Sequence, residues 1–211
     1  MRDNKTEKII LEAAEQEFLL KGFAGTRTTE IASRAGVNHA MLHYYFDTKE
    51  QLFEKVLAEK MELFRNSVVS VFEINEMPIK EMVSEAMSRH FDFLQANPSL
   101  PRFLLNEVIS RQEYMARARQ AVTKIAEEPL RNLQQRLDDA AECGEICRID
   151  AIMLLMDIAS LNIFAFMVEP IVSSVGIGGE SFYQARKAEN IRVIMQRLTP
   201  NSEPLCNEMY Y

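Results

Sequence analysis

The fold of this chain is decided by residues 26–50, which read TRTTEIASRAGVNHAMLHYYFDTKE. We expect a first short helix that is capped by the hydroxyl group of Thr28 or of a neighbour and that packs through Ile31 and Ala32. Gly36 stands where this helix would end, because glycine takes a left-handed backbone without strain. The stretch therefore predicts two short helices joined by a tight turn.

The second helix, over residues 39–46, has two distinct faces. Asn38 can cap its start, and Leu42, Tyr45 and Phe46 recur at the spacing of one buried face. The outward positions are then His39, Ala40, His43 and Tyr44. Two helices that meet at a short glycine turn indicate a helix-turn-helix, whose second helix enters the major groove of DNA.

A longer set of positions carries a resemblance to a known family. Its members are Thr26, Ile31, Ala32, Ala35, Gly36, Val37, Leu42, Tyr45, Phe46, Lys49, Glu50 and Leu52. In this order they resemble the DNA-binding domain of tetracycline-repressor-like (TetR) regulators. The resemblance implies a dimer that binds a near-palindromic double-stranded DNA operator. It also implies a small-molecule effector held in a second domain, whose binding usually ends repression.

The reading helix departs from the usual family run, Ser-x-Gly-Thr/Ser-Leu-Tyr-x-Tyr-Phe. Asn38, Ala40, Met41 and His43 stand at its Ser, Gly, Thr/Ser and first Tyr positions. We expect Asn38 or His39 to reach a base edge and Ala40 or Met41 to meet a thymine methyl group. His43, Tyr44 and Lys49 resemble the family's phosphate contacts. The predicted DNA-binding residues are Arg27, Thr28, Asn38, His39, Ala40, Met41, His43, Tyr44 and Lys49.

Charge is the one global property that argues against a nucleic-acid partner. The chain carries a formal net charge of −7, whereas phosphate binding uses lysine and arginine. Residues 21–49 hold four basic residues against two acidic ones, a local charge of +2: Lys21, Arg27, Arg34 and Lys49 against Glu30 and Asp47. We therefore expect weak non-specific affinity for DNA and strong loss of binding with salt.

The rest of the chain reads as helices, because no stretch shows sustained alternation with β-branched residues. The predicted fold is all-α, with an N-terminal three-helix helix-turn-helix domain joined by a long helix to a C-terminal helical ligand-binding and dimerisation bundle. The predicted domains are residues 1–50 and 51–200, followed by a tail at 201–211. The predicted helices cover 5–20, about 25 residues after Thr48, 79–95, 100–110, 112–142 with a kink or division at Pro129, 148–172 and 180–198.

The effector pocket is predicted from position alone. Twelve methionines and twelve phenylalanines suit a core that adapts its shape, although each one singly is better explained as core packing. The predicted pocket residues are Phe64, Phe91, Phe103, Tyr114 and Phe164.

The dimer surface is predicted on the last two helices. Residues 151–168 are apolar on more than one side, which a partner subunit would explain, and the resemblance points to the same helices. The alternative is a central helix buried within one chain. The predicted interface residues are Ile152, Leu155, Ala159, Ile163, Phe166, Ile191 and Ile194.

Two other classes of function compete with DNA binding. An enzyme is disfavoured by the scarcity of histidine, of which there are three, and by the lack of a glycine-rich phosphate loop, a Gly-x-Ser-x-Gly elbow or a His-Glu-x-x-His motif. His39 and His43 are four apart, but the sequence puts no further metal ligand on that face, so we predict no metal and no cofactor. A helical adaptor that binds another protein and has lost DNA binding is the second competitor, favoured by the acidic charge and the altered reading helix.

Cysteine usage and the N-terminus point to the cytoplasm. The three cysteines lack zinc-ribbon spacing and are expected to be free thiols, with a redox sensor as the alternative. The first ten residues, MRDNKTEKII, lack a signal peptide's apolar core. Asp157 and Asn162 interrupt the longest apolar run, which predicts a buried helix and no membrane span.

Overall fold

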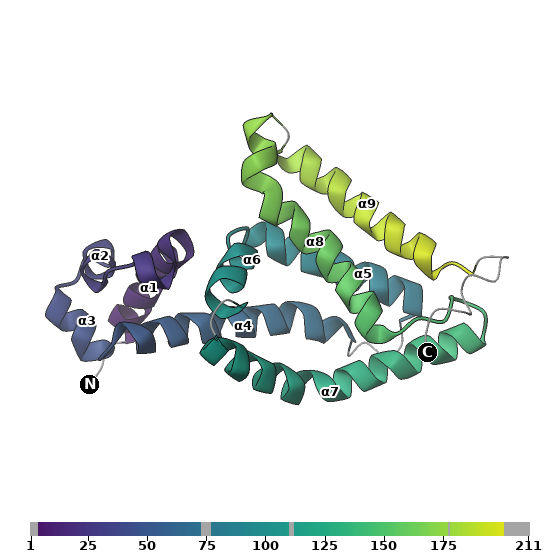
Figure 1. Ribbon diagram of the computed structural model, residues 1–211, viewed down its shortest axis with the longest axis horizontal. Helices are drawn as coiled ribbons and strands as arrows, with labels where there is room; N and C mark the ends of the chain where they lie inside the picture. Colours follow the sequence, from purple (N-terminus) through teal and green to yellow (C-terminus); the bar gives the residue numbers. More distant parts are fainter. Residues whose placement is uncertain (1–3, 73–76, 110–111, 177, 201–211) are drawn as a thin grey trace. The chain divides into compact units, whose positions relative to one another are not determined.

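The computed structural model describes residues 4–72, 77–109, 112–176 and 178–200, and within them it contains helices and turns but no strand (Figure 1). The all-α prediction is confirmed. The helices are α1 (Asn4–Gly25), α2 (Thr28–Arg34), α3 (His39–Tyr45), α4 (Lys49–Phe72), α5 (Ile79–Ala96), α6 (Leu100–Phe103), a π-helical turn η1 (Leu104–Ile109), α7 (Gln112–Glu142), α8 (Ala151–Ser174) and α9 (Glu180–Leu198).

The chain divides into two compact units. The first comprises residues 1–65 and 102–116, and the second comprises residues 66–101 and 117–211. Helix α4 contributes its first two thirds to the first unit and its end to the second. The segment 102–116 belongs with the first unit, although it lies some fifty residues beyond the helix-turn-helix in sequence.

An aromatic cluster forms the core of the first unit. The ring of Phe53 lies 5.1 Å from those of Phe18 and Phe23, and 5.6 Å from that of Phe103. Edge-to-face packing of this kind adds to the stabilisation from buried apolar area. The cluster joins α1, α4 and α6, and so fixes the helices on which the helix-turn-helix rests.

The second unit is built on α5, α7, α8 and α9, with α5 in contact with both α8 and α9 (Figure 1). Its main core is apolar and consists of Ile79, Met82, Val83, Ala86, Met87, Leu133, Leu137, Ala140, Ile146, Ile149, Ala151, Leu154, Ile158, Ile194 and Leu198. Helical spacing within each element brings these side chains to one face.

Several predicted helices differ from those observed. Helix α1 extends to Gly25 and not to residue 20, with non-helical backbone at Gly22, and the helix predicted over 100–110 is divided into α6 and η1. Pro129 does not divide α7, which is one helix of 31 residues. Helix α8 begins at Ala151, three residues later than predicted, because the carboxylate of Asp150 caps it by accepting a hydrogen bond from the amide of Met153 at 3.0 Å.

Residues Ala151–Glu169 of α8 are long and apolar enough, by length and composition, to cross a membrane, and 33% of that segment is buried within the chain. The same length and composition occur in the core helices of proteins that never enter a membrane.

Candidate nucleic-acid interface

The turn between α2 and α3 is closed by the backbone itself. Gly36 has φ of +67°, and the amides of Gly36 and Val37 donate to the carbonyl oxygens of Ser33 and Ala32 at 3.2 and 3.0 Å. This pattern is the Schellman ending of a helix, which requires a left-handed residue at its centre. The predicted role of Gly36 is confirmed.

Helix α3 is held at its start and along one face. The Asn38 side chain accepts from the amide of Met41 at 2.7 Å, as predicted for a cap. Leu42 and Phe46 are buried and Tyr45 is half-buried. Because this face is anchored, the opposite face is presented to solvent in a defined orientation.

The exposed face of α3 carries the residues that the sequence assigned to DNA. His39, Ala40, Met41, His43 and Tyr44 are all exposed, and Tyr44 retains 58% of its accessible surface. Met41 and Tyr44 thus leave apolar surface open to solvent beside the polar atoms of the two histidines. The geometry is that of a recognition helix.

Neighbouring side chains hold the two histidines in place. The Nε2 atom of His39 lies 2.9 Å from the hydroxyl oxygen of Thr28, which ties α3 to α2. The Nδ1 atom of His43 lies 3.2 Å from the carbonyl oxygen of Asp47. The two rings meet edge to face at 4.4 Å between centroids. The reading surface is therefore partly preorganised.

Two of the four basic residues counted near the motif are occupied elsewhere. Glu17, only 3% exposed, lies 2.7 Å from both Lys21 and Arg34. Lys21 also lies 3.1 Å from Glu30. The hydrogen bond from Lys21 lowers the pKa of Glu17 and of Glu30, so both carboxylates are charged at neutral pH. The charge count over residues 21–49 did not include Glu17. Because the Glu17 carboxylate balances part of the positive charge of Lys21 and Arg34, these two residues attract DNA phosphates less strongly than the count suggests.

Arg27 and Lys49 remain nearer the predicted contact surface. Arg27 is exposed, and its backbone amide donates to Glu30 at 3.4 Å while its side chain extends into solvent. The ammonium group of Lys49 lies 4.3 Å from the centre of the Phe23 ring, a cation-π arrangement on a half-buried residue. Thr48 caps α4 through the amide of Gln51 at 3.1 Å.

Three of the five predicted pocket residues have side chains that the structure describes. Phe91 is buried in the second unit against Phe166, at 5.1 Å between ring centroids, whereas Phe103 belongs to the aromatic core of the first unit. Phe164 is 61% exposed and lines no interior space. The side chains of Phe64 and Tyr114 lie outside the part of the chain that the structure describes. An exposed Phe164 does not fit an interior pocket, whereas Phe91 and Phe103 stay predictions, because helical spacing does not tell which face of a helix is covered.

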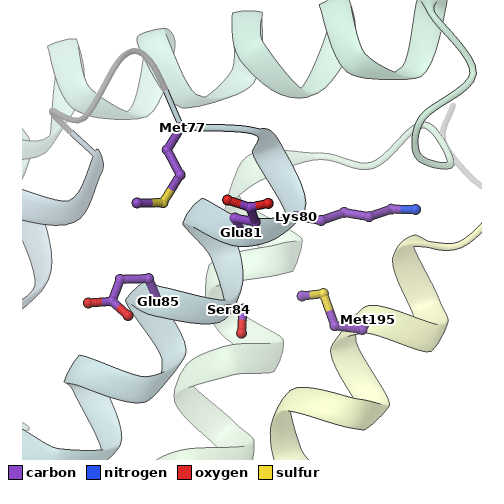
Figure 2. Close-up of a pocket in the computed structure, with 6 residues that line it drawn as sticks. All are labelled: Met77, Lys80, Glu81, Ser84, Glu85 and Met195. Carbon is purple, nitrogen blue, oxygen red and sulfur yellow. The ribbon is translucent and has the colours of Figure 1, made fainter.

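An open groove of about 420 Å³ lies beside the start of α5 in the second unit. Figure 2 shows its lining, with Met195 of α9 opposite the residues of α5 and the preceding turn: Met77, Lys80, Glu81, Ser84 and Glu85. Most of these side chains are polar or charged. The groove holds none of the aromatic residues predicted for the effector pocket.

The predicted dimer residues separate into two groups. Phe166 and Ile194 are buried within their own chain, at 2% and 1% exposure, and are withdrawn from the interface. Ile152 is exposed, and Leu155, Ala159, Ile163 and Ile191 are half-buried. Further exposed apolar residues, not among those predicted, are Met153, Met156, Phe164 and Ile171 on α8, Val175 at its C-cap and Val193 on α9.

A buried polar network, which the sequence reasoning missed, joins α5, α8 and α9. The amide of Asn162 donates to the carbonyl oxygen of Met87 at 3.1 Å and lies 3.3 Å from Nδ1 of His90. The amide of Asn190 donates to the side-chain oxygen of Asn162 at 2.9 Å. Burial lowers the pKa of His90 to about 4. Asn162 was visible in the sequence as a polar break in an apolar run.

Comparison with known proteins shows the family. Residues 10–56 match the family described as "Bacterial regulatory proteins, tetR family", and residues 80–196, more than half of the chain, match "Tetracyclin repressor-like, C-terminal domain". The helix-turn-helix and the helical second unit are the parts that these matches cover. The chain belongs to the TetR family of transcriptional regulators.

Two relatives illustrate the range of sequence similarity. The chain is 29% identical over 104 residues to the HTH-type transcriptional repressor NicS of Pseudomonas putida, covering 49% of each chain. It is 32% identical over 129 residues to the HTH-type transcriptional repressor SCO4008 of Streptomyces coelicolor, covering 56% of this chain and 62% of that one. The matched segments thus span about half to three fifths of these relatives.

The fold extends further than the sequence similarity. The crystal structure of FadR from Bacillus subtilis in complex with stearoyl-CoA matches 90% of this chain and 98% of its own, with a TM-score of 0.63 and 21% identity. At this identity the likeness concerns the fold alone. It confirms an N-terminal helix-turn-helix followed by a helical domain.

Proposed function

We propose that this chain represses transcription as a homodimer that binds a near-palindromic DNA operator and is released by a small molecule. The observation that carries the proposal is the exposed face of α3, where a capped and anchored short helix presents five side chains to solvent. A two-fold dimer would place two such helices about one DNA turn apart. Its place of action is the cytoplasm, where the DNA is.

The proposed dimer surface is the outward face of α8 with part of α9. Ile152, Met156, Phe164, Ile171 and Val175 form an apolar stripe along α8, and Phe164, Ile171 and Val175 each keep more than 60% of their surface exposed. A stripe of this length favours a second copy of the same surface, as two-fold symmetry requires. On α8, the proposed dimer interface is therefore limited to the residues that α5 and α9 leave exposed.

The effector is proposed to be a small molecule that binds the second unit. Two observations support an effector site in the second unit. The second unit matches the C-terminal domain of the family, and FadR, which has a similar fold, was crystallised with stearoyl-CoA. A ligand releases DNA only to the extent that it binds the released conformation more tightly than the DNA-bound one. Stearoyl-CoA is a first probe, and its effect on DNA affinity decides whether this chain responds to the same class of ligand.

Selection of bound fragments from random and genomic DNA tests the proposal. The purified full-length protein, at about 0.1 M salt, is expected to enrich a near-palindrome whose halves lie about one turn apart. Enrichment of a single half-site would mean that the protein binds as a monomer. No enrichment by a folded protein would overturn sequence-specific binding.

A protein-binding adaptor is the second candidate, and the charge arrangement favours it. Lys21 and Arg34 are held by Glu17 and Glu30, which leaves the DNA face with less positive charge than the sequence indicates. The two candidates differ in salt dependence. A regulator loses DNA affinity steeply with salt because counterions are released, whereas an adaptor is indifferent to DNA at every salt concentration.

A further inference from the structure

The side chain of His43 is held in one tautomer by its neighbour. Its Nδ1 atom lies 3.2 Å from the backbone carbonyl oxygen of Asp47, and a carbonyl oxygen can only accept a hydrogen bond. Nδ1 must therefore carry the hydrogen. Because a neutral imidazole has a single N–H group, the Nε2 atom of neutral His43 is left as a bare acceptor.

This tautomer changes what His43 can contact on DNA. Phosphate oxygens accept hydrogen bonds but donate none, so neutral His43, whose only hydrogen is used by Asp47, has nothing to offer them. Neutral His43 therefore cannot make the phosphate contact that the family resemblance implies, because only a doubly protonated ring would have a second N–H group to donate. Its Nε2 atom requires a donor as partner.

Only two bases offer a donor in the major groove. Adenine presents its N6 amino group and cytosine its N4 amino group, whereas guanine N7 and O6 and thymine O4 are acceptors. The His43 ring is exposed on α3, and its edge-to-face contact with His39 at 4.4 Å restricts its rotation. His39 is itself tied to Thr28 at 2.9 Å. A restrained acceptor on a recognition helix suits base reading.

We propose that His43 determines one position of each operator half-site by accepting a hydrogen bond, through Nε2, from the amino group of adenine or cytosine. The inference rests on the proposed function, because it places α3 in the major groove. It assigns a base-reading role to a position that resemblance assigns to the backbone. Guanine and thymine are disfavoured there because an acceptor would then face an acceptor.

The experiment compares operators selected at pH 8 by the wild-type protein, His43→Ala and Tyr44→Ala. His43→Ala is expected to lose the preference for adenine or cytosine at one symmetry-related pair of positions and to keep the others. Tyr44→Ala is the matched control. Tyr44 is the neighbour of His43 on α3 and is predicted to contact phosphate, so its loss is expected to weaken binding to all DNA sequences alike. Thermal unfolding of each variant confirms that this exposed substitution leaves the fold intact.

A base analogue then tests the hydrogen bond itself. At the position in question, adenine is replaced by purine, or cytosine by pyrimidin-2-one, which removes only the amino group. Wild-type affinity is expected to fall about three- to tenfold, the range of one net hydrogen bond, while His43→Ala shows no further loss.

The outcomes separate the inference from the function on which it rests. If wild-type protein enriches an operator but His43→Ala keeps every base preference and binds all sites uniformly more weakly, His43 contacts phosphate and the inference is wrong. Because every base pair contains either adenine or cytosine, the analogues decide the contact: unchanged wild-type affinity after removal of the amino group from that pair would overturn the inference equally. If the wild-type protein enriches nothing, the proposed function fails, before any variant is measured, and the inference fails with it.

Discussion

The outward faces of α3 and α8 differ in how their side chains are held. On α3 the exposed histidines are tied to Thr28 and to the Asp47 carbonyl, and the helix is capped by Asn38. On α8 the exposed residues, such as Met156 and Phe164, are apolar and extend into solvent. Directional, tethered groups suit a partner with a fixed hydrogen-bonding pattern, and an apolar stripe suits a surface that excludes water. The difference supports the proposal of two interfaces with two kinds of partner.

The largest expected effect comes from charging the α8 stripe. Met156→Glu combined with Phe164→Glu places four carboxylates across a two-fold interface and should abolish the dimer. Operator affinity should then fall about 1,000-fold, because linked binding of two half-sites is worth 10²- to 10⁴-fold. Sedimentation and DNA titration measure the two effects.

The matched control for this variant adds the same negative charge to α7. Arg131→Gln with Asn132→Glu alters two exposed residues and should leave the dimer intact. Equal loss of dimer in both proteins would show that charge alone, and not the α8 stripe, is responsible.

The burial of His90, on α5, beside Asn162 of α8 predicts a loss of stability in acid. Because burial holds the pKa of His90 at about 4, below its ordinary value of 6.5, folding favours the neutral ring. Stability is therefore complete above pH 6.5 and is lost as the pH falls from 6.5 toward 4. The loss should approach about 3 kcal/mol, from about 1.4 kcal/mol per pKa unit.

Urea unfolding of the wild-type protein and of His90→Gln across this pH range isolates the histidine, because the carboxylates titrate in both proteins. The difference in unfolding free energy between them should shrink in acid. A constant difference from pH 7 to pH 4 would show that His90 is protonated at no cost in the folded chain.

Gly36→Val should disturb the α3 face without touching α8. No atom lies within 4 Å of the position of an added Cβ atom, so the cost is one of backbone conformation alone. At φ of +67° a β-branched residue should lower the unfolding free energy by about 2 kcal/mol. Chemical denaturation measures the loss.

Gly36→Asn is the control, since asparagine tolerates the left-handed region and should lose much less stability. If Val and Asn are equally tolerated, Gly36 is not held in the left-handed conformation in solution.

The smallest expected effect is that of Glu17→Gln in the frame of the helix-turn-helix. Glu17 is buried, but its partners Lys21 and Arg34 remain partly solvated, so the loss should be about 1 kcal/mol. Non-specific DNA affinity should rise, because two cations lose their carboxylate. Chemical denaturation measures the loss of stability, and DNA titration at low salt measures the non-specific affinity. Weaker non-specific binding by Glu17→Gln would instead mean that the ion pairs of Glu17 position α3.

The helix-turn-helix could be predicted because its signals are local. Gly36, Asn38 and Thr48 each act on backbone groups within three or four residues, so their types and spacing already determine the turn and the two caps. The outward face of α3 followed from helical spacing once Leu42 and Phe46 were assigned to the core. Structure that depends on interactions between residues close in the chain can therefore be predicted from a single sequence.

The parts that could not be predicted depend on contacts between distant residues. Arg34 meets Glu17 seventeen positions away, and Phe103 meets Phe53 fifty positions away. On α8, apolar residues occur on every side, so periodicity does not say that Phe166 faces inward and Phe164 outward. A sequence that is apolar all round carries no signal for the covered face.

Hydrogen exchange with and without a selected DNA fragment tests the central claim, that the exposed face of α3 contacts DNA. Using the full-length protein, we expect slower exchange of amides in residues 38–46 with the selected fragment than with a scrambled fragment of equal length. Protection confined to the second unit, or equal protection by both fragments, would contradict the claim.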